Sequence, residues 1–230
     1  MTTDKKQKSV NTQRMPLQER VKEKRRLVYL QAINEAAERV FAEKGAGDSR
    51  MPEIAAEAGI SLGTMYGIID GKDSLFHGIH KLRTDEFLDC ISDARDEVDG
   101  ILPGHLAVLR SGALYFLNHS DFLRICCRDG YGWAASFPAS GPGKTPWNEG
   151  TSILHDLFTR GIEENTYVGD DPELLVRKML ALQQVELTHW VEHGMETPHE
   201  IVLARLEDQF VRAFCTPESQ QLHVAMETSS

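Results

Sequence analysis

Two pairs of histidines have the spacing that places both side chains on one face of a helix. His77 and His80 are three residues apart, and His189 and His193 are four residues apart. Each pair could supply two ligands to a metal ion, but a protein zinc site uses about three or four, and neither pair has clear partners for the rest. We therefore interpret both pairs as surface or hydrogen-bonded histidines. Because the sequence also lacks a Ser/His/Asp spacing and a paired-carboxylate motif, it predicts no catalytic residue, no metal and no cofactor, and a protein that is not an enzyme.

The segment GPGKT at residues 141–145 has part of the pattern of a phosphate-binding P-loop. The full pattern requires a glycine where Pro138 stands and an apolar strand ahead of it, and the sequence has neither. The surrounding stretch, residues 128–150, has five glycines and three prolines and also carries several aromatic residues, Trp133 and Trp147 among them. It suits either a lid over an apolar pocket or a plain surface connection.

A third set of side chains suits contact with DNA. The hydroxyl of Tyr66 and the ammonium of Lys72 can bind phosphates, which fixes register without reading sequence. Thr64 can reach a base edge or a thymine methyl, and Arg50 can reach guanine or a phosphate. The whole predicted DNA-binding set is Arg50, Ser61, Leu62, Gly63, Thr64, Tyr66, Gly67 and Lys72, together with Lys24, Arg25 and Arg26 from the N-terminal arm.

Charge is distributed very unevenly along the chain. Residues 1–26 hold nine Lys/Arg and three Asp/Glu, a net charge of +6, whereas the whole 230-residue chain has a net charge of −10. A basic arm on an acidic body indicates a local contact with a polyanion, and a solvated tail that only aids solubility is the alternative. We expect this arm to contact phosphates or a minor groove.

The elements that position these residues are helices. From Leu27 the apolar residues recur at the helical period, and Gly45 and Gly47 end this helix. Pro52 opens a second, short helix that ends at Gly59. Ser61 can cap a third, from about residue 62 to 68, and a fourth begins near Asp73. Two short helices joined by a turn that contains glycine form a helix-turn-helix, and the second helix of such a pair enters the major groove.

The rest of the chain is also predicted to be helical. Helical patterns cover about residues 106–117, 121–127, 151–164, 172–193 and 198–214, and no strand-like alternation persists. The predicted fold is all-α: an N-terminal three-helix unit with a helix-turn-helix, followed by a larger helical bundle. No apolar run approaches the ~20 residues of a membrane span. The four cysteines show no CxxC spacing, so we expect reduced thiols and a cytoplasmic protein.

Residues 26–76 resemble the TetR family of bacterial transcription regulators. The matching positions are Ala36-Ala37, Val40-Phe41, Gly45, Ile54-Ala55, Ala58-Gly59, Ile60-Ser61, Gly63-Thr64, Tyr66, Lys72, Asp73 and Leu75. The chain departs from the family at Arg50, where Ser or Thr is usual, and at Gly67 and Ile68, where bulkier polar or aromatic residues are usual. The resemblance implies an all-helical homodimer that binds a palindromic operator and is released from it by a small molecule.

On this resemblance the chain divides into an arm expected to be disordered (1–26), a DNA-binding domain (27–87, motif about 50–69), an effector-binding and dimerisation domain (88–216) and a flexible tail (217–230). Candidate residues for a pocket that takes an apolar or aromatic effector are Tyr115, Phe116, His119, Trp133, Trp147, Phe158 and Gln183. Candidates for the dimer interface are Leu182, Trp190, Leu203 and Phe210, which would otherwise lie in the core of one protomer. The alternative function is a helical small-molecule-binding protein that keeps the helix-turn-helix as a scaffold.

Overall fold

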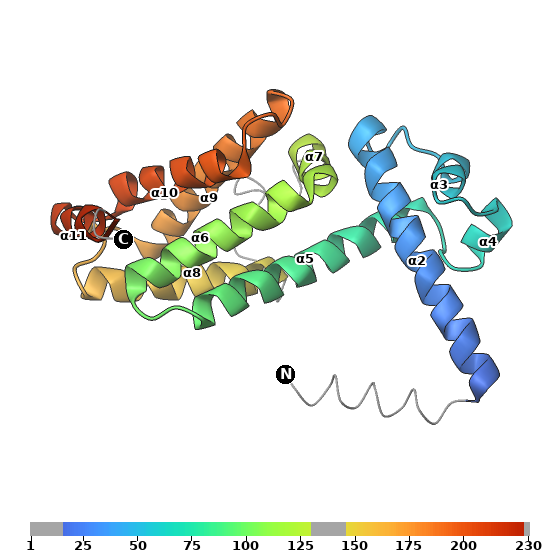
Figure 1. The fold of residues 1–230 in the computed structure, drawn as a ribbon, viewed down its shortest axis with the longest axis horizontal. Helices are drawn as coiled ribbons and strands as arrows, with labels where there is room; N and C mark the ends of the chain where they lie inside the picture. Colours follow the sequence, from blue (N-terminus) through green and yellow to red (C-terminus); the bar gives the residue numbers. More distant parts are fainter. Residues whose placement is uncertain (1–15, 130–145, 228–230) are drawn as a thin grey trace. The chain divides into compact units, whose positions relative to one another are not determined.

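The computed structural model describes residues 16–129 and 146–227, which form helices joined by short turns (Figure 1). With the labels of Figure 1, the helices are α2 (Leu17–Lys44), α3 (Met51–Glu57), α4 (Leu62–Tyr66), α5 (Lys72–Asp96), α6 (Ile101–Asn118), α7 (Ser120–Asp129), α8 (Pro146–Glu163), α9 (Pro172–Glu192), α10 (His199–Phe214) and α11 (Pro217–Glu227). Within these ranges the only β-type pairing is an isolated bridge between Tyr167 and Cys215. The predicted all-α fold is therefore confirmed.

The chain divides into two compact units between Ile79 and His80. This boundary lies eight residues before the predicted one at residue 87. Helix α5 runs through it, so its first eight residues belong to the first unit and the remainder to the second. None of the helices in the described ranges combines the length and the hydropathy that crossing a bilayer requires.

The first unit is built on α2, against which α3 packs, and α4 packs on α3 (Figure 1). Its core consists of side chains at most 2% exposed, among them Ile33, Phe41, Ile54 and Met65. The ring of Phe41 also meets that of Phe76 edge-on, with the centroids 5.6 Å apart. This apolar core fixes the position of the helix-turn-helix.

Helix α2 begins at Leu17, so the prediction that residues 1–26 form a disordered arm is wrong for residues 17–26. Pro16 precedes the helix, and from there to Lys44 the sequence has no glycine or proline and is rich in good helix formers. None of the side chains of residues 17–32 is buried, so intrinsic helix propensity rather than packing accounts for these turns. Residues 1–15 of the predicted arm lie outside the described residues.

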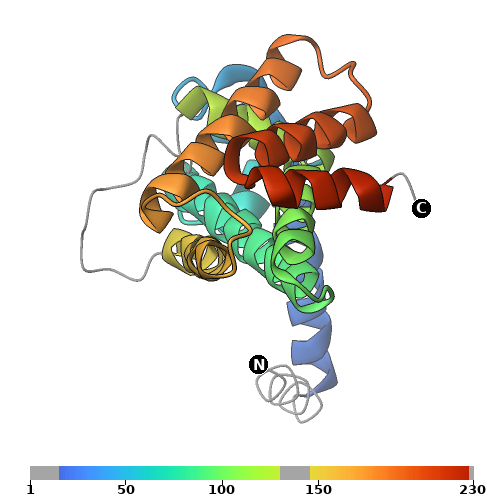
Figure 2. The same ribbon diagram turned by 90° about the vertical axis from the view of Figure 1, so that its left-hand side faces the viewer.

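In the second unit α6 packs against α7, α8, α9 and α10, and α9 lies alongside α10 (Figure 2). The predicted flexible tail is wrong for Pro217–Glu227, which form α11. The hydroxyl of Thr216 accepts a hydrogen bond from the Ser219 N–H at 3.3 Å, and Pro217 occupies the first helical position. These are ordinary helix-start signals, which the sequence shows and the prediction overlooked.

Candidate DNA-binding surface and effector cavity

The turn between α3 and α4 is closed by hydrogen bonds from both sides. Gly59 adopts a φ of +67°, in the left-handed region that favours glycine, and the Ile60 N–H donates to the Ala55 carbonyl at 3.0 Å. On the far side, the Ser61 hydroxyl accepts from the Thr64 N–H at 3.0 Å, as an N-cap does. Ser61 and Thr64 also share a hydroxyl–hydroxyl hydrogen bond of 2.8 Å. Both residues therefore have a structural role in the turn, in addition to the predicted contact with DNA.

Helix α4 has one buried position and an exposed face. Met65 is 0% exposed and anchors the helix to the core, as its position in the pattern predicts. Leu62, Gly63, Tyr66 and Gly67 are exposed, and the Tyr66 side chain is 54% exposed. This face offers one hydroxyl, one apolar side chain and two bare stretches of backbone.

Arg50 lies exposed immediately before α3, where its backbone N–H donates to the Glu53 carboxylate at 3.3 Å. This bond is half of a capping box, so Glu53 helps to begin the helix although Ser or Thr is absent at position 50. The Glu53 carboxylate also accepts from Lys44 at 3.1 Å, and this hydrogen bond lowers the pKa of Glu53. Arg50 itself is exposed and suitably placed to reach an anion.

Lys72 has a role that the sequence did not reveal. Its ammonium donates to the carbonyls of Gly47 at 2.9 Å and Ser49 at 3.0 Å, so it ties the start of α5 to the loop between α2 and α3. An ammonium has three N–H donors, which leaves one for the predicted phosphate contact.

Lys24, Arg25 and Arg26 near the start of α2 are exposed, and two of them make weak local contacts. The Arg25 guanidinium donates to the Tyr29 hydroxyl at 2.8 Å and lies 5.3 Å from the ring centroid. Arg26 lies 3.7 Å from the Glu23 carboxylate. Exposed contacts of this kind contribute about 0–1 kcal/mol, so either cation can exchange them for a phosphate, and Lys24 is exposed beside them.

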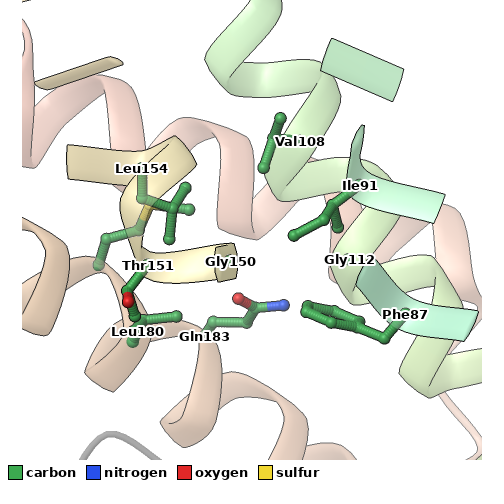
Figure 3. A pocket seen from close by; sticks show the side chains of 10 residues that line it. Phe87, Ile91, Val108, Gly112, Gly150, Thr151, Leu154, Leu180 and Gln183 are labelled. Atoms are coloured by element: carbon green, nitrogen blue, oxygen red, sulfur yellow. The ribbon is translucent and has the colours of Figure 1, made fainter. Parts of the chain in front are cut away.

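The second unit contains a cavity of about 30 Å³ between α5, α6, α8 and α9 (Figure 3). Its lining is largely apolar and consists of Phe87, Ile91, Val108, Gly112, Gly150, Thr151, Leu154, Met179, Leu180 and Gln183. Gly112 and Gly150 allow α6 and α8 to approach α5, because a Cβ there would lie 3.2 Å from Phe87 and 3.1 Å from Leu88. Gly112, a glycine within the predicted helical pattern at residues 106–117, was the signal in the sequence that could have located this cavity.

Among the predicted pocket residues, Gln183 lines this cavity, with its amide between the lining side chains (Figure 3). Phe116 and Phe158 are buried in the core nearby. Tyr115 is also buried, its hydroxyl lies 2.9 Å from the Glu86 carboxylate, and burial first and this carboxylate second raise its pKa. His119 ends α6 and stacks on Tyr115.

Two other pocket candidates, and most of the stretch that suits either a lid or a surface connection, fall outside what the structure describes. Trp133 lies outside the described residues, as do residues 130–145, and the side chain of Trp147 is not described. Gly150, at the end of the stretch predicted to be a loop, already lies in α8 and lines the cavity.

A buried histidine next to the cavity was not anticipated. His105 is 0% exposed and lies between the rings of Phe158 and Phe210, with centroids 4.5 Å and 4.6 Å away. Its Nε2 is 3.2 Å from the sulfur of Met179, and its Nδ1 is 3.0 Å from the Tyr167 hydroxyl. Burial favours the neutral imidazole by lowering the pKa of His105. A thioether only accepts, so in this neutral form Nε2 carries the hydrogen and Nδ1 accepts from the Tyr167 hydroxyl.

The predicted dimer residues lie mostly inside the protomer. Trp190, Leu203 and Phe210 are at most 4% exposed in the second unit's own core, and Leu182 is partly exposed. Val185 and Ile201, on the same two helices, are 68% and 52% exposed. Among the described residues, no three His, Cys, Asp or Glu side chains come together in a way that could hold a metal ion.

Comparison with known proteins gives a family match for residues 33–79 and similar folds over 79–81% of the chain. Residues 33–79 match the family model described as bacterial regulatory proteins, tetR family. No curated protein matches the chain. Among solved structures, the ketosteroid transcriptional regulator KstR2 of Mycobacterium tuberculosis is similar at 17% identity with a TM-score of 0.66, over 81% of this chain and 95% of that one. The transcriptional regulator FadR from Bacillus subtilis, solved in complex with stearoyl-CoA, is similar at 18% identity with a TM-score of 0.64, over 79% and 97%.

Proposed function

We propose that this chain, a member of the TetR family of bacterial transcription regulators through its residues 33–79, is a repressor whose affinity for DNA is controlled by a small molecule. The observation that carries the proposal is α4, which buries Met65 and exposes the opposite face, while Arg50 at the start of α3 is exposed as well. Tyr66, Lys72 and the cations of α2 would fix the phosphate backbone, while Leu62 and Thr64 would meet base edges. A regulator of this kind acts in the cytoplasm.

The cavity of the second unit supports a role for an effector. A FadR solved in complex with stearoyl-CoA has a similar fold, so a regulator of this fold can accommodate a molecule that carries a long apolar chain. Two lining residues, Phe87 and Ile91, lie on α5, the helix that begins at Lys72 in the first unit. A ligand larger than the cavity must displace such side chains and so acts on α5. Such a ligand changes the affinity for DNA to the extent that it binds more tightly when α5 is in one position than when α5 is in another.

The DNA-binding proposal is tested by a gel shift with the DNA upstream of the chain's own operon, in the presence of excess unrelated competitor. We expect a complex that survives the competitor, and we expect deletion of residues 1–20 to weaken it and to flatten its dependence on salt. An unchanged affinity and an unchanged salt slope would show that the N-terminal residues do not contact DNA.

The same assay distinguishes the alternative function, a ligand-binding protein that keeps the helix-turn-helix as a scaffold. One observation favours this alternative: the exposed face of α4 carries no Arg, Asn or Gln, the side chains that read bases with paired hydrogen bonds. Equal binding to upstream and unrelated DNA would support it.

We further propose a homodimer through the outer faces of α9 and α10, as a palindromic operator would require. The buried Glu186 carboxylate on α9 pairs with Arg205 on α10 at 3.0 Å, which holds the two helices together, and Val185 stands exposed next to it. We expect Val185→Glu to convert dimers into monomers in sedimentation velocity runs. Val168→Glu, at an exposed apolar residue between α8 and α9, is the matched control. A Val185→Glu protein that stays dimeric would place the interface elsewhere.

A further inference from the structure

The polar groups of the cavity are few. Of its lining residues, only Thr151 and Gln183 bring a side-chain oxygen or nitrogen, and no Lys, Arg, His, Asp or Glu is among them. A carboxylate or an ammonium placed in this cavity would lose its hydration without gaining a partner of opposite charge. The lining therefore selects against charged ligand groups.

Gln183 is buried, with 6% of its surface exposed, and its amide lies among the lining side chains (Figure 3). Its Nε2 has no hydrogen-bond partner anywhere in residues 16–129 and 146–227. Buried donors in native proteins nearly always have a partner, because leaving one unpaired costs the full desolvation of the group. This donor is thus an unused binding group at the edge of an apolar space.

We propose that Gln183 selects the effector, which is an uncharged and mainly apolar molecule with a carbonyl or similar oxygen that accepts a hydrogen bond from Nε2. This inference rests on the proposed effector role of the cavity and adds the chemical class of the ligand. The aliphatic residues Ile91, Leu154 and Leu180 and the ring of Phe87 hold the apolar body, while Gln183 holds the oxygen.

The volume of the cavity determines how binding proceeds. At about 30 Å³ it has room for one or two water molecules, well below the ~300–1,000 Å³ of sites that hold larger ligands. Where α6 and α8 meet α5, the close contacts are with the side chains of Phe87 and Leu88 rather than with backbone. These side chains can rotate to enlarge the cavity without unfolding a helix.

The test compares three probes of similar size that differ in polarity: acetophenone, ethylbenzene and benzoate. Binding to the full-length protein is measured by isothermal titration calorimetry for the wild type, for Gln183→Leu and for the matched control Gln184→Leu, one residue further along α9. We expect the wild type and the control to bind the ketone about three- to tenfold more tightly than the hydrocarbon, as one added hydrogen bond provides, and to bind benzoate more weakly than either. Gln183→Leu should lose the preference for the ketone and keep its affinity for ethylbenzene.

An equal affinity of the wild type for ketone and hydrocarbon, or a ketone preference that survives in Gln183→Leu, would overturn the inference and leave water as the partner of the amide. So would failure of all three probes to bind. None of these outcomes bears on DNA binding, which the gel shift measures separately. Loss of operator binding in that assay, with the ketone preference intact, would contradict the proposed function alone.

Discussion

His105 gives the second unit a pH-dependent stability that can be calculated. Its imidazole is enclosed between Phe158 and Phe210, and its tautomer is fixed by Tyr167 and Met179. Burial, assisted by the charge of Arg95, lowers the pKa of His105 from its ordinary 6.5 to about 3. Because protonation would place a charge in this apolar core, the folded protein keeps the imidazole neutral over the range in which the unfolded chain takes up a proton.

The direction of the effect follows from proton uptake. Between pH 6.5 and about 3 the unfolded state binds a proton at this residue and the folded state does not, so the free energy of unfolding falls as the pH falls. The full contribution of His105 is present above pH 6.5. Going from pH 7 to pH 5 should reduce the free energy of unfolding by about 2 kcal/mol through this residue alone.

The assay is urea unfolding of the wild type and of His105→Gln at pH 7 and pH 5, followed by circular dichroism at a fixed protein concentration. The neutral glutamine removes the titration, so the wild type should lose about 2 kcal/mol more than the variant over this interval. His155→Gln, at an exposed position of α8, should behave as the wild type does. Equal losses in the wild type and His105→Gln would refute the assignment of a buried neutral imidazole.

Two further predictions concern the DNA-binding unit. Gly63→Ala should raise the free energy of unfolding of this unit by about 0.5–1 kcal/mol, because alanine favours the helix and an added Cβ would have only the Ser61 hydroxyl within 4 Å, at 3.9 Å. The same substitution should weaken operator binding in the gel shift. An unchanged affinity would show that α4 does not lie against DNA. Lys72→Met should lower the free energy of unfolding of the unit by about 1–3 kcal/mol, because the hydrogen bonds to Gly47 and Ser49 are lost. It should also reduce the salt slope of DNA binding by about 1 if the ammonium contacts a phosphate. An unchanged slope would leave Lys72 with a structural role only.

The helix-turn-helix could be predicted because its determinants are local. Gly59 ends α3 and Ser61 caps α4 through hydrogen bonds that span only a few residues, so the sequence alone indicates them. The bond from Lys72 to Ser49 joins residues 23 positions apart, and no short pattern marks it. The helical start of α2 was missed for another reason: its turns bury no side chain, and the prediction relied on an apolar face.

The cavity of the second unit was harder to predict because large aromatic residues are poor markers of empty space. Phe116 and Phe158 fill the core, as bulky apolar side chains do whenever neighbours can close around them. The cavity is lined in part by Gly112 and Gly150, where α6 and α8 lie close against the side chains of Phe87 and Leu88 on α5. Gln183 was among the predicted pocket residues, and its amide donor is buried without a partner among the residues that the structure describes.

The four glycines spaced every fourth residue from 59 to 71 have two different explanations. Gly59 and Gly71 have φ values of +67° and +148°, which side-chain-bearing residues rarely adopt, so the fold itself requires glycine there. Gly67 has a φ of −74°, and an added Cβ at Gly63 or Gly67 would meet nothing closer than 3.4 Å. Helix stability favours alanine over glycine at Gly63, within α4, and the backbone angles at Gly67, the C-cap of α4, do not require glycine, so the fold gives no reason for glycine at either position. We propose that the reason is a DNA backbone or groove that comes close to the helix main chain on the exposed face of α4.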